Sequence, residues 1–590
     1  MNKKIILFAL IAALFVGCSS TKTSVAPEIA IVYTNDVHTY INNMVKVDGK
    51  YVPGLRFSKI AGLVRDLKGE GKEVILVDAG DEIQGTSYGS FDEGVSVIDL
   101  MSATGYKVAA IGNHEFDYGA DHFYDISKKA GFDYVSCNFH YIGKDGKHKD
   151  FAPYKIIKAG GKKIAFIGIS TPETLTSSSP TNFQNHKGEF LYSIDGCSDA
   201  KELYSAVQNA IDAVKPKADY CIALGHLGVS MGEIKGHISS ADVIANTKGL
   251  DAFIGGHSHS TIAGEKVRDA GGKEVLSTQT GAYLTSVGIM TLGIDGKIGT
   301  KFLKDYDSFD EKVAVLEDRL VDRINQIYGK QIAVLETKLD VNSPEVENRR
   351  LIRAQEMNIG DFVADSVYWF FNENQRLDCD AAIVNGGGIR TFIKEGPVTV
   401  NDVKNVQPFG NMVCIIKATG QQILDALEMG ATVTGEWDYE WNSPAENGGF
   451  LHVAGMKYEI DSSYESSVIK DEKGMFVSVN GKYRVKNVCI FNKKSGTYEP
   501  LDLKKTYSLA GINYLLRNSG NGLSMLSKCD VIVDYAGQDY EILADYCRSF
   551  AREDGFARIK TAGSRLHEYK GYLIDYENPF GAGRIKILKK

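Results

Sequence analysis

The segment VAAIGNHEFD, residues 108–117, puts an amide, an imidazole and two carboxylates directly after four apolar residues. The apolar half is typical of a buried strand, and the polar half is costly to bury unless something pairs with it. Four other segments repeat this arrangement: YTNDVH, VDAGDEIQG, ALGHLG and FIGGHSHS. The carboxyl ends of strands line the ligand crevice in open α/β sheets. The five segments therefore predict one site at one edge of a layered α/β fold.

The length and charge of the chain limit its class. A single hydrophobic core stops growing at roughly 250–300 residues, so the 590 residues indicate two domains. With 43% apolar and 24% charged residues, the composition is ordinary for a globular protein. The net charge of −8 argues against binding to nucleic acid, which requires a strongly basic surface. Local arginine clusters that grip small anions remain compatible with this charge.

The N-terminus has the pattern of a targeting segment. Lys3 and Lys4 precede the apolar run 5–16, which is shorter than the ~20 residues that span a bilayer and is typical of a secretory signal. The ending LFVGC resembles a bacterial lipobox, so we expect a signal peptide over 1–18, a lipid on Cys18 and a polar tether over 19–28. This predicts an exported protein, periplasmic or on the cell surface, that contacts the membrane only through its lipid.

The remaining eight cysteines are widely spaced and include no CxxC pair. They predict neither a zinc ribbon nor a disulfide framework. We interpret most of them as small buried residues.

Strand-like runs alternate with amphipathic or loop segments from residue 29 onward, which predicts an α/β domain over 29–307. A linker helix is predicted over 308–333, where Ser308 and Glu311 match a capping box and Gly329 matches a stop. Its apolar residues recur at helical spacing at Val313, Leu316, Leu320, Ile324 and Ile327. Residues 334–590 mix helices and strands and form the predicted second, α+β domain.

The strand-end clusters contain seven candidate metal ligands, namely Asp36, His38, Asp81, Asn113, His226, His257 and His259. Each has an ordinary reading by itself: an aspartate can cap a turn, and a lone histidine is more often a satisfied, partly buried residue. As a set, nitrogen and oxygen ligands without cysteine suit Zn²⁺, Mn²⁺ or Fe. Seven ligands suit two ions bridged by a carboxylate, and two ions roughly 3.5–4 Å apart clamp the oxygens of a transferring phosphoryl group.

The motifs D-x-H, GD, GNHE-x-D, GH and GGHSH, in this order, resemble those of the calcineurin-type binuclear metallophosphoesterases, and among them the 5′-nucleotidase/UDP-sugar hydrolase family. The resemblance implies a β-sandwich flanked by helices and two divalent ions, Zn or Mn. It assigns one ion to Asp36, His38, Asp81 and His259, and the other to Asp81, Asn113, His226 and His257. Gln84 is expected near the ions without binding them.

His114 and Asp117 lie three residues apart, so on a helical turn they face each other. The carboxylate then orients the ring and stabilises its protonated form, as in a hydrolase triad. The resemblance implies that this dyad faces the phosphate, stabilises its charge and protonates the leaving oxygen while a metal-bound hydroxide attacks. The ordinary alternative is a helix N-terminal turn. Glu115 is expected either to face solvent or to support a metal ligand.

Three segments of the second domain suggest what it recognises. Arg349 and Arg353 lie four residues apart, on one face if the segment is helical, and arginine forks suit phosphate. A solvated basic face is the alternative. The segment NGGGIR combines glycines that allow close approach with Arg390. Phe409 lies in the turn QPFGN, where it either stacks on a flat base or anchors the loop.

These segments resemble the C-terminal substrate domain of the same family, in the same order. The resemblance implies phosphate binding by Arg349, Arg353 and Arg390, base contacts from Asn385 and Asn411, and close approach at Gly387. It also implies an aromatic clamp formed by Phe409 and Tyr514, where tyrosine replaces the usual phenylalanine.

One segment departs from the family pattern. The motif usually ends in GGDG, whose aspartate binds the ribose hydroxyls, whereas this chain has NSGNG, with one extra residue and Asn521 at that place. Asparagine still forms hydrogen bonds with a diol but is not a charged acceptor. Deoxynucleotides or other phosphate esters therefore stay open as substrates.

The sequence thus predicts a phosphohydrolase that removes the 5′-phosphate of nucleoside monophosphates. A second reading is hydrolysis of a UDP-sugar or a 2′,3′-cyclic nucleotide at the same site. A third, of another class, is a surface lipoprotein that binds nucleotides without catalysis.

Overall fold

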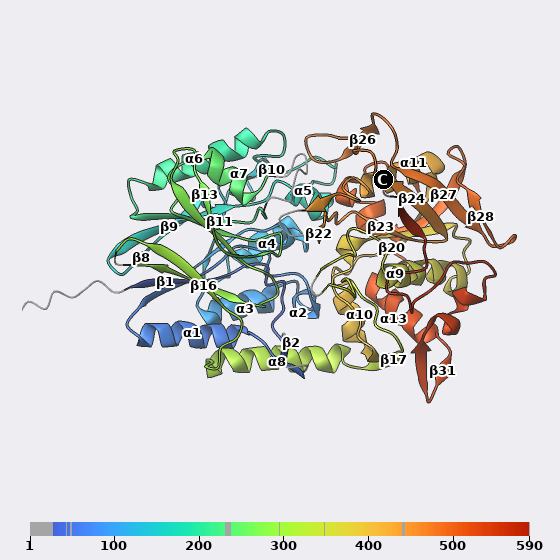
Figure 1. Cartoon of the computed structure of the whole chain (residues 1–590), viewed down its shortest axis with the longest axis horizontal. Helices are drawn as coiled ribbons and strands as arrows, with labels where there is room; N and C mark the ends of the chain where they lie inside the picture. The colour runs from blue at the N-terminus through green and yellow to red at the C-terminus, as the bar shows by residue number, and fades with distance from the viewer. Residues whose placement is uncertain are drawn as a thin grey trace, which may run out of the picture.

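The computed structural model describes residues 28–588 except 43, 48–49, 145, 230–237, 294, 347–348 and 439–442. The predicted signal peptide and Cys18 lie outside the described residues. Two lobes lie side by side, the first blue to green and the second yellow to red in Figure 1. Within the described residues, no helix is both long and apolar enough to cross a membrane. The eight described cysteines carry free thiols, and five of them are buried, in agreement with the sequence interpretation.

Two six-stranded sheets pack face to face in the first lobe. Side chains such as Ile31 and Val77 from one sheet and Phe166 and Leu224 from the other form the core between them. The inner strands of both sheets are buried on both faces, which explains their nearly continuous apolar sequences. The first has the order β16(Ile298–Leu303), β15(Val287–Leu292), β1(Ile29–Thr34), β4(Glu73–Asp78), β5(Val108–Ala110), β6(Asp133–Val135). The second has the order β13(Thr261–Arg268), β14(Glu274–Thr280), β12(Ala252–Gly255), β11(Tyr220–Gly225), β9(Lys162–Ile169), β8(Tyr154–Ala159).

Helices cover the outer faces of both sheets. The first sheet packs against α1(Phe57–Gly69) and α3(Val95–Thr104), and α8(Glu311–Tyr328) packs against these two helices. The second packs against α6(Ala200–Val214) and α7(Ser240–Asn246). The predicted β-sandwich flanked by helices is confirmed.

The helix α8 connects the two lobes along one side of the molecule (Figure 1). The predicted capping box at Ser308 is wrong: the Ser308 hydroxyl accepts a hydrogen bond from Arg65, and the Asp310 carboxylate caps the helix by accepting from the N–H groups of Lys312 and Val313. Leu316 and Ile327, predicted on the apolar face, are 40% and 46% exposed. The stop at Gly329 is confirmed.

The second lobe is an α+β domain around one large core. Its central sheet has the order β23(Leu451–Ala454), β18(Ala381–Asn385), β29(Thr506–Ile512), β20(Val413–Thr419), β30(Asp530–Val533). The domain also contains two four-stranded sheets. One has the order β19(Gly396–Thr399), β17(Gln331–Leu335), β32(Phe556–Ile559), β31(Arg552–Glu553), and the other has the order β28(Thr497–Pro500), β27(Val485–Asn492), β24(Met456–Asp461), β33(Ile585–Leu588). The main helices are α9(Asn358–Trp369), α10(Val400–Val406), α11(Gly420–Gly430) and α13(Asp539–Ser549).

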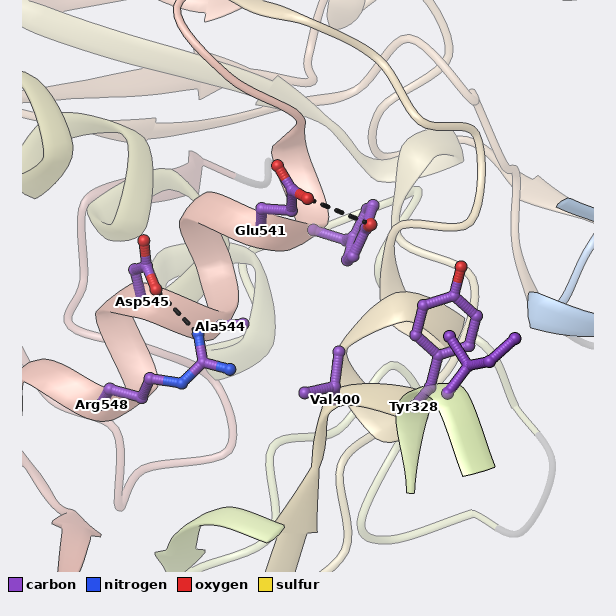
Figure 2. Close-up of a pocket in the computed structure, with 8 residues that line it drawn as sticks. Tyr328, Val400, Glu541, Ala544, Asp545 and Arg548 are labelled. Carbon is purple, nitrogen blue, oxygen red and sulfur yellow. Dashed lines mark hydrogen bonds and ion pairs between the residues drawn. The ribbon is translucent and has the colours of Figure 1, made fainter. Parts of the chain in front are cut away.

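The last turn of α8 contacts the second lobe through aromatic and cationic side chains. The Lys404 ammonium lies 4.0 Å from the ring centroid of Tyr540 and 5.3 Å from that of Tyr328. A cavity of about 430 Å³ opens here between Tyr328 and α13 (Figure 2). The arginine that lines it, Arg548, is paired with Asp545. The cavity therefore offers no unpaired arginine to an anion, and we interpret it as a gap between packed helices.

Candidate active site

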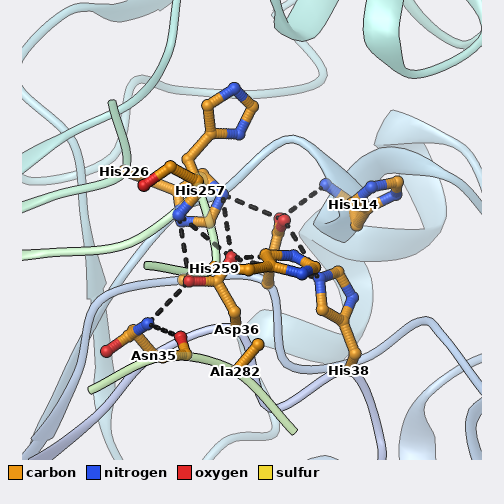
Figure 3. Close-up of polar contacts among 12 residues, drawn as sticks. Asn35, Asp36, His38, His114, His226, His257, His259 and Ala282 are labelled. Carbon is orange, nitrogen blue, oxygen red and sulfur yellow. Dashed lines mark hydrogen bonds and ion pairs between the residues drawn. The ribbon is translucent and has the colours of Figure 1, made fainter. Parts of the chain in front are cut away.

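The predicted metal ligands converge at the carboxyl ends of strands from both sheets of the sandwich. Asp36 and His38 follow β1, Asp81 follows β4, Asn113 follows β5, His226 follows β11, and His257 and His259 follow β12. Residues that span more than 220 positions thus meet where the two sheets end together (Figure 3). Asp36, His38 and His226 are fully buried, and Asp81 and Asn113 are nearly so.

Several of these residues hold an unusual backbone conformation. Asp36, His38, Asp81, His257 and His259 have φ angles of 48°, 46°, 65°, 87° and 59°. This left-handed region costs non-glycine residues of the order of 1–3 kcal/mol each, and such residues cluster at functional sites. The glycine of GNHE is required by close approach, since a Cβ on Gly112 would lie 2.3 Å from Asp81 Oδ1.

The Asp81 carboxylate lies between two groups of side chains. Its Oδ2 atom is 2.9 Å from His226 Nε2 and 3.6 Å from His38 Nε2. The Nε2 atoms of His38 and His259 lie 3.0 Å apart, and His259 Nε2 is 3.5 Å from Asp36 Oδ1. Among the described residues, three sets have ligand atoms within 4.8 Å of one another: Asp36, His38 and His259; Asp81, His226 and His257; and His38, Asp81 and His114.

The charges of this cluster suit bound cations. Burial raises the pKa of Asp36 to about 7, and the neighbouring Asp81 carboxylate also raises it. Burial lowers the pKa of His226, but the Asp81 and Asp36 carboxylates outweigh this and raise it to about 10. Asn113 Oδ1 is buried and has no hydrogen-bond partner among the described residues, which is unusual for a buried acceptor. Nitrogen and oxygen donors around a shared carboxylate therefore fit a pair of divalent ions.

Neighbouring groups fix the orientation of the histidines. The Nδ1–H group of His38 donates to the Gln84 carbonyl oxygen, and that of His226 donates to the Ala79 carbonyl oxygen, both over 2.8 Å. Such bonds direct the other ring nitrogen toward a metal. His257 Nε2 lies 3.4 Å from Glu173 Oε2, a partner that the sequence did not single out. The Gln84 side chain is buried near the cluster, and its amide has no partner among the described residues.

Glu115 supports the loop that carries Asp81. It is fully buried, so the expectation that it faces solvent is wrong. Its carboxylate accepts hydrogen bonds from the backbone N–H groups of Asp81, Glu82 and Gly112, over 3.0, 2.9 and 2.7 Å. The alternative expectation, support of a metal ligand, agrees with these contacts.

His114 begins the short helix η1(His114–Phe116) and forms the expected pair with Asp117, the residue that follows the helix. His114 Nδ1 is 2.5 Å from Asp117 Oδ2, and the His114 backbone N–H donates to Asp81 Oδ1 over 2.9 Å. Asp117 therefore occupies Nδ1 and leaves Nε2 for another partner. The ring centroid of His114 lies 5.9 Å from that of Phe409 in the second lobe.

A cleft of about 1780 Å³ separates the lobes and joins the metal cluster to the second domain. All nine predicted substrate residues line it: Arg349, Arg353, Asn385, Gly387, Arg390, Phe409, Asn411, Tyr514 and Asn521. These segments lie far apart in the sequence, but the fold brings them to the same cleft as His114, His257 and His259. Four of the candidate metal ligands, namely Asp81, Asn113, His257 and His259, therefore line the same cleft as the predicted substrate residues.

The arginines of the cleft include one that the sequence analysis overlooked. The segment 349–353 is not helical, so its arginines do not share a helix face. Arg350 forms a bidentate ion pair with Glu446, with nitrogen–oxygen distances of 2.5–3.0 Å. Burial lowers the pKa of Arg353 to about 9, and the Arg350 and Arg390 cations contribute to the shift. An anion in the cleft would relieve this crowding of positive charge.

The aromatic residues of the cleft have polar partners. The Arg390 guanidinium lies 5.7 Å from the ring centroid of Phe409. The Tyr514 hydroxyl donates to the Thr176 carbonyl oxygen over 3.0 Å and accepts from the Asn521 N–H over 3.1 Å. Both rings are partly exposed to the cleft. The Asn411 carbonyl oxygen accepts from the N–H of Asp539 over 2.9 Å.

Fold and site together define a metallophosphoesterase with a second, substrate-type domain. A family model described as a calcineurin-like phosphoesterase matches residues 29–261, and one described as the C-terminal domain of 5′-nucleotidase matches residues 332–528. The chain belongs to the 5′-nucleotidase family, and it is a hydrolase of that type.

Relatives extend over most of the chain. A 5′-nucleotidase of Vibrio parahaemolyticus is 26% identical over 87% of this chain and 93% of its own length. A trifunctional nucleotide phosphoesterase protein of Bacillus subtilis is 24% identical over 89% of this chain, which spans 34% of that longer protein. The crystal structure of a 5′-nucleotidase precursor from Thermus thermophilus superposes with a TM-score of 0.74 at 25% identity, covering 95% of this chain and 99% of that one.

Proposed function

We propose that this protein is an exported, lipid-anchored phosphohydrolase that removes the 5′-phosphate of nucleoside monophosphates with two divalent ions. The observation that carries the proposal is the shared cleft, in which metal ligands, arginines and two aromatic side chains face one another. Residues 29–307 provide the metal ligands, α8 connects the domains, and residues 334–590 provide the substrate contacts. The signal-like segment ending at Cys18 supports the anchor.

We assign one ion to Asp36, His38, Asp81 and His259. The second is assigned to Asp81, Asn113, His226 and His257. Zn²⁺ and Mn²⁺ both suit these donors. When bound, such ions polarise phosphoryl oxygens and lower the pKa of water.

The chain's own residues then divide the remaining work. Arg349, Arg353 and Arg390, with Arg350 beside them, place positive charge where the phosphate enters. Phe409 and Tyr514 receive the base by stacking. His114, with its Nδ1 held by Asp117, directs Nε2 at the phosphate, stabilises developing charge there and supplies a proton to the leaving oxygen.

A panel of phosphate esters tests this assignment of substrate. Released phosphate is measured for AMP, UMP, UDP-glucose, 2′,3′-cyclic AMP and p-nitrophenyl phosphate. The proposal expects the highest kcat/KM for the nucleoside monophosphates. A preference for UDP-glucose or the cyclic nucleotide would reassign the substrate. Nucleotide binding without any hydrolysis, in metal-loaded protein, would contradict the proposal.

A further inference from the structure

His257 uses its ring nitrogens in the opposite way from two other histidines of the cluster. His38 and His226 each donate from Nδ1–H to a backbone carbonyl oxygen, and their Nε2 atoms face Asp81. In His257 it is Nε2 that has a partner, the carboxylate of Glu173 at 3.4 Å. A histidine that binds a metal through one ring nitrogen usually donates a hydrogen bond from the other. His257 is therefore left with Nδ1 as its nitrogen for an ion.

The surroundings of His257 restrict how its ring lies. Its backbone N–H donates to both oxygens of the Asp36 carboxylate, over 3.0 and 2.9 Å (Figure 3). A Cβ on Gly228 would lie 3.5 Å from His257 Cδ2, so this edge of the ring lies against the loop that follows β11. A half-turn of the ring would exchange Nδ1 with Cδ2 and move Nε2 away from Glu173. The contact with Glu173 therefore favours one of two ring orientations.

The backbone of Glu173 is fixed by the short helix α5(Thr174–Ser177), which begins directly after it. Its carbonyl oxygen accepts from the N–H groups of Thr176 and Ser177, both over 2.9 Å, and its own N–H donates to the Thr171 hydroxyl over 3.3 Å. The Glu173 side chain is exposed and lines the cleft. Its replacement therefore opens no cavity in the hydrophobic core, and a variant at this position keeps the fold.

We propose that Glu173 is a positioning residue for the second ion: it accepts from the Nε2–H group of His257 and so directs Nδ1 at that ion. This inference rests on the proposed two-ion hydrolase. His257 is assigned to the second ion only, so loss of Glu173 weakens the second ion and spares the first. Glu173 itself contacts the ligand and does not bind the metal.

Two possible roles of Glu173 can be separated by substitution. As a hydrogen-bond acceptor it fixes the tautomer of His257, whereas as a negative charge it would attract cations without orienting a ligand. Glutamine keeps an acceptor oxygen and loses the charge, and alanine loses both. Glu472 is the matched control, because it lines the same cleft from the second domain and its removal deletes a charge there.

The test measures the affinity of both ions in full-length protein. Wild type, Glu173→Ala, Glu173→Gln and Glu472→Ala are stripped of metal and titrated with Mn²⁺ by calorimetry, and free Mn²⁺ is followed by electron paramagnetic resonance. We expect Glu173→Ala to weaken one ion about 10- to 100-fold, the usual loss when the partner of a metal-bound histidine is removed, and to leave the other ion unchanged. Glu173→Gln and Glu472→Ala should both bind two ions as the wild type does.

Wild-type affinity for both ions in Glu173→Ala would overturn the inference. A loss in Glu173→Gln or Glu472→Ala as large as that in Glu173→Ala would also overturn it, because charge alone would then explain the effect. A wild-type protein that binds two ions with the expected dependence on Glu173, but releases no phosphate from AMP, would defeat the nucleotidase function and confirm the positioning role.

Discussion

The Tyr514 hydroxyl donates a hydrogen bond to the carbonyl oxygen of Thr176 over 3.0 Å and so joins the two domains across the cleft. The Tyr514 hydroxyl oxygen also accepts a hydrogen bond from the Asn521 N–H. A phenylalanine here would stack equally well on a base but would form neither bond. The hydroxyl therefore links the aromatic clamp of the second domain to the helix α5(Thr174–Ser177) of the first.

Tyr514→Phe tests this link. We expect kcat/KM for AMP to fall about 3- to 10-fold, the value of one or two neutral hydrogen bonds, while base stacking survives. Steady-state kinetics measure the change. Tyr535→Phe is the matched control, because Tyr535 is 65% exposed and should leave the kinetics unchanged. An unaltered kcat/KM in Tyr514→Phe would show that the link has no role in turnover.

His114→Ala separates catalysis from metal binding. We expect turnover to fall about 10²- to 10⁴-fold, the usual contribution of a positioned acid or base, with two ions still bound per chain. Metal content by mass spectrometry and phosphate release are measured on the same sample. Because the set of His38, Asp81 and His114 also has ligand atoms within 4.8 Å, loss of an ion in this variant would make His114 a ligand and contradict the dyad.

Arg390→Ala and Arg349→Ala form a matched pair. The Arg390 guanidinium lies 5.7 Å from the ring centroid of Phe409, which itself lies 5.9 Å from that of His114. The Arg349 guanidinium lies 5.5 Å from the ring centroid of Trp437 instead. We expect Arg390→Ala to raise KM for AMP about 10- to 100-fold, the value of charge-assisted hydrogen bonds, and Arg349→Ala to raise it less. Equal effects would refute this ranking.

Asp539 gives the stability of the second domain a predicted pH dependence. Burial raises its pKa to about 7 from the usual 3.8, so between these values the folded state binds more protons than the unfolded state. Stability therefore falls as the pH rises through this window. We expect Asp539→Asn to gain thermal stability relative to wild type as the pH rises from 4 to 8, measured by calorimetry. A difference that is constant with pH would contradict the assigned pKa.

The sequence predicted that the candidate metal ligands would lie close together, because each of them belongs to a short motif at the end of a strand. Apolar runs that predict buried strands directly precede Asp36, Asp81, Asn113 and His226. The carboxyl ends of such strands lie together at one edge of a sheet. The same logic predicted the sandwich and its flanking helices.

Contacts between distant segments could not be predicted. Arg350 and Glu446 lie 96 residues apart, and neither belongs to a motif, so their ion pair emerges only on folding. Glu173 escaped notice for the same reason. The capping box failed because a tertiary contact from Arg65 engages Ser308, which leaves Asp310 to cap α8. A local sequence pattern therefore predicts a helix cap only where no distant side chain forms a hydrogen bond with the capping residue.

Metal titration of depleted protein tests the central claim most directly. Protein stripped with EDTA receives Zn²⁺ or Mn²⁺ in increasing ratio to the chain, and phosphate release from AMP is recorded at each step. The account predicts no release from the stripped protein and full recovery as two ions bind per chain. Hydrolysis of AMP that survives complete removal of metal, or none with two ions bound, would contradict it.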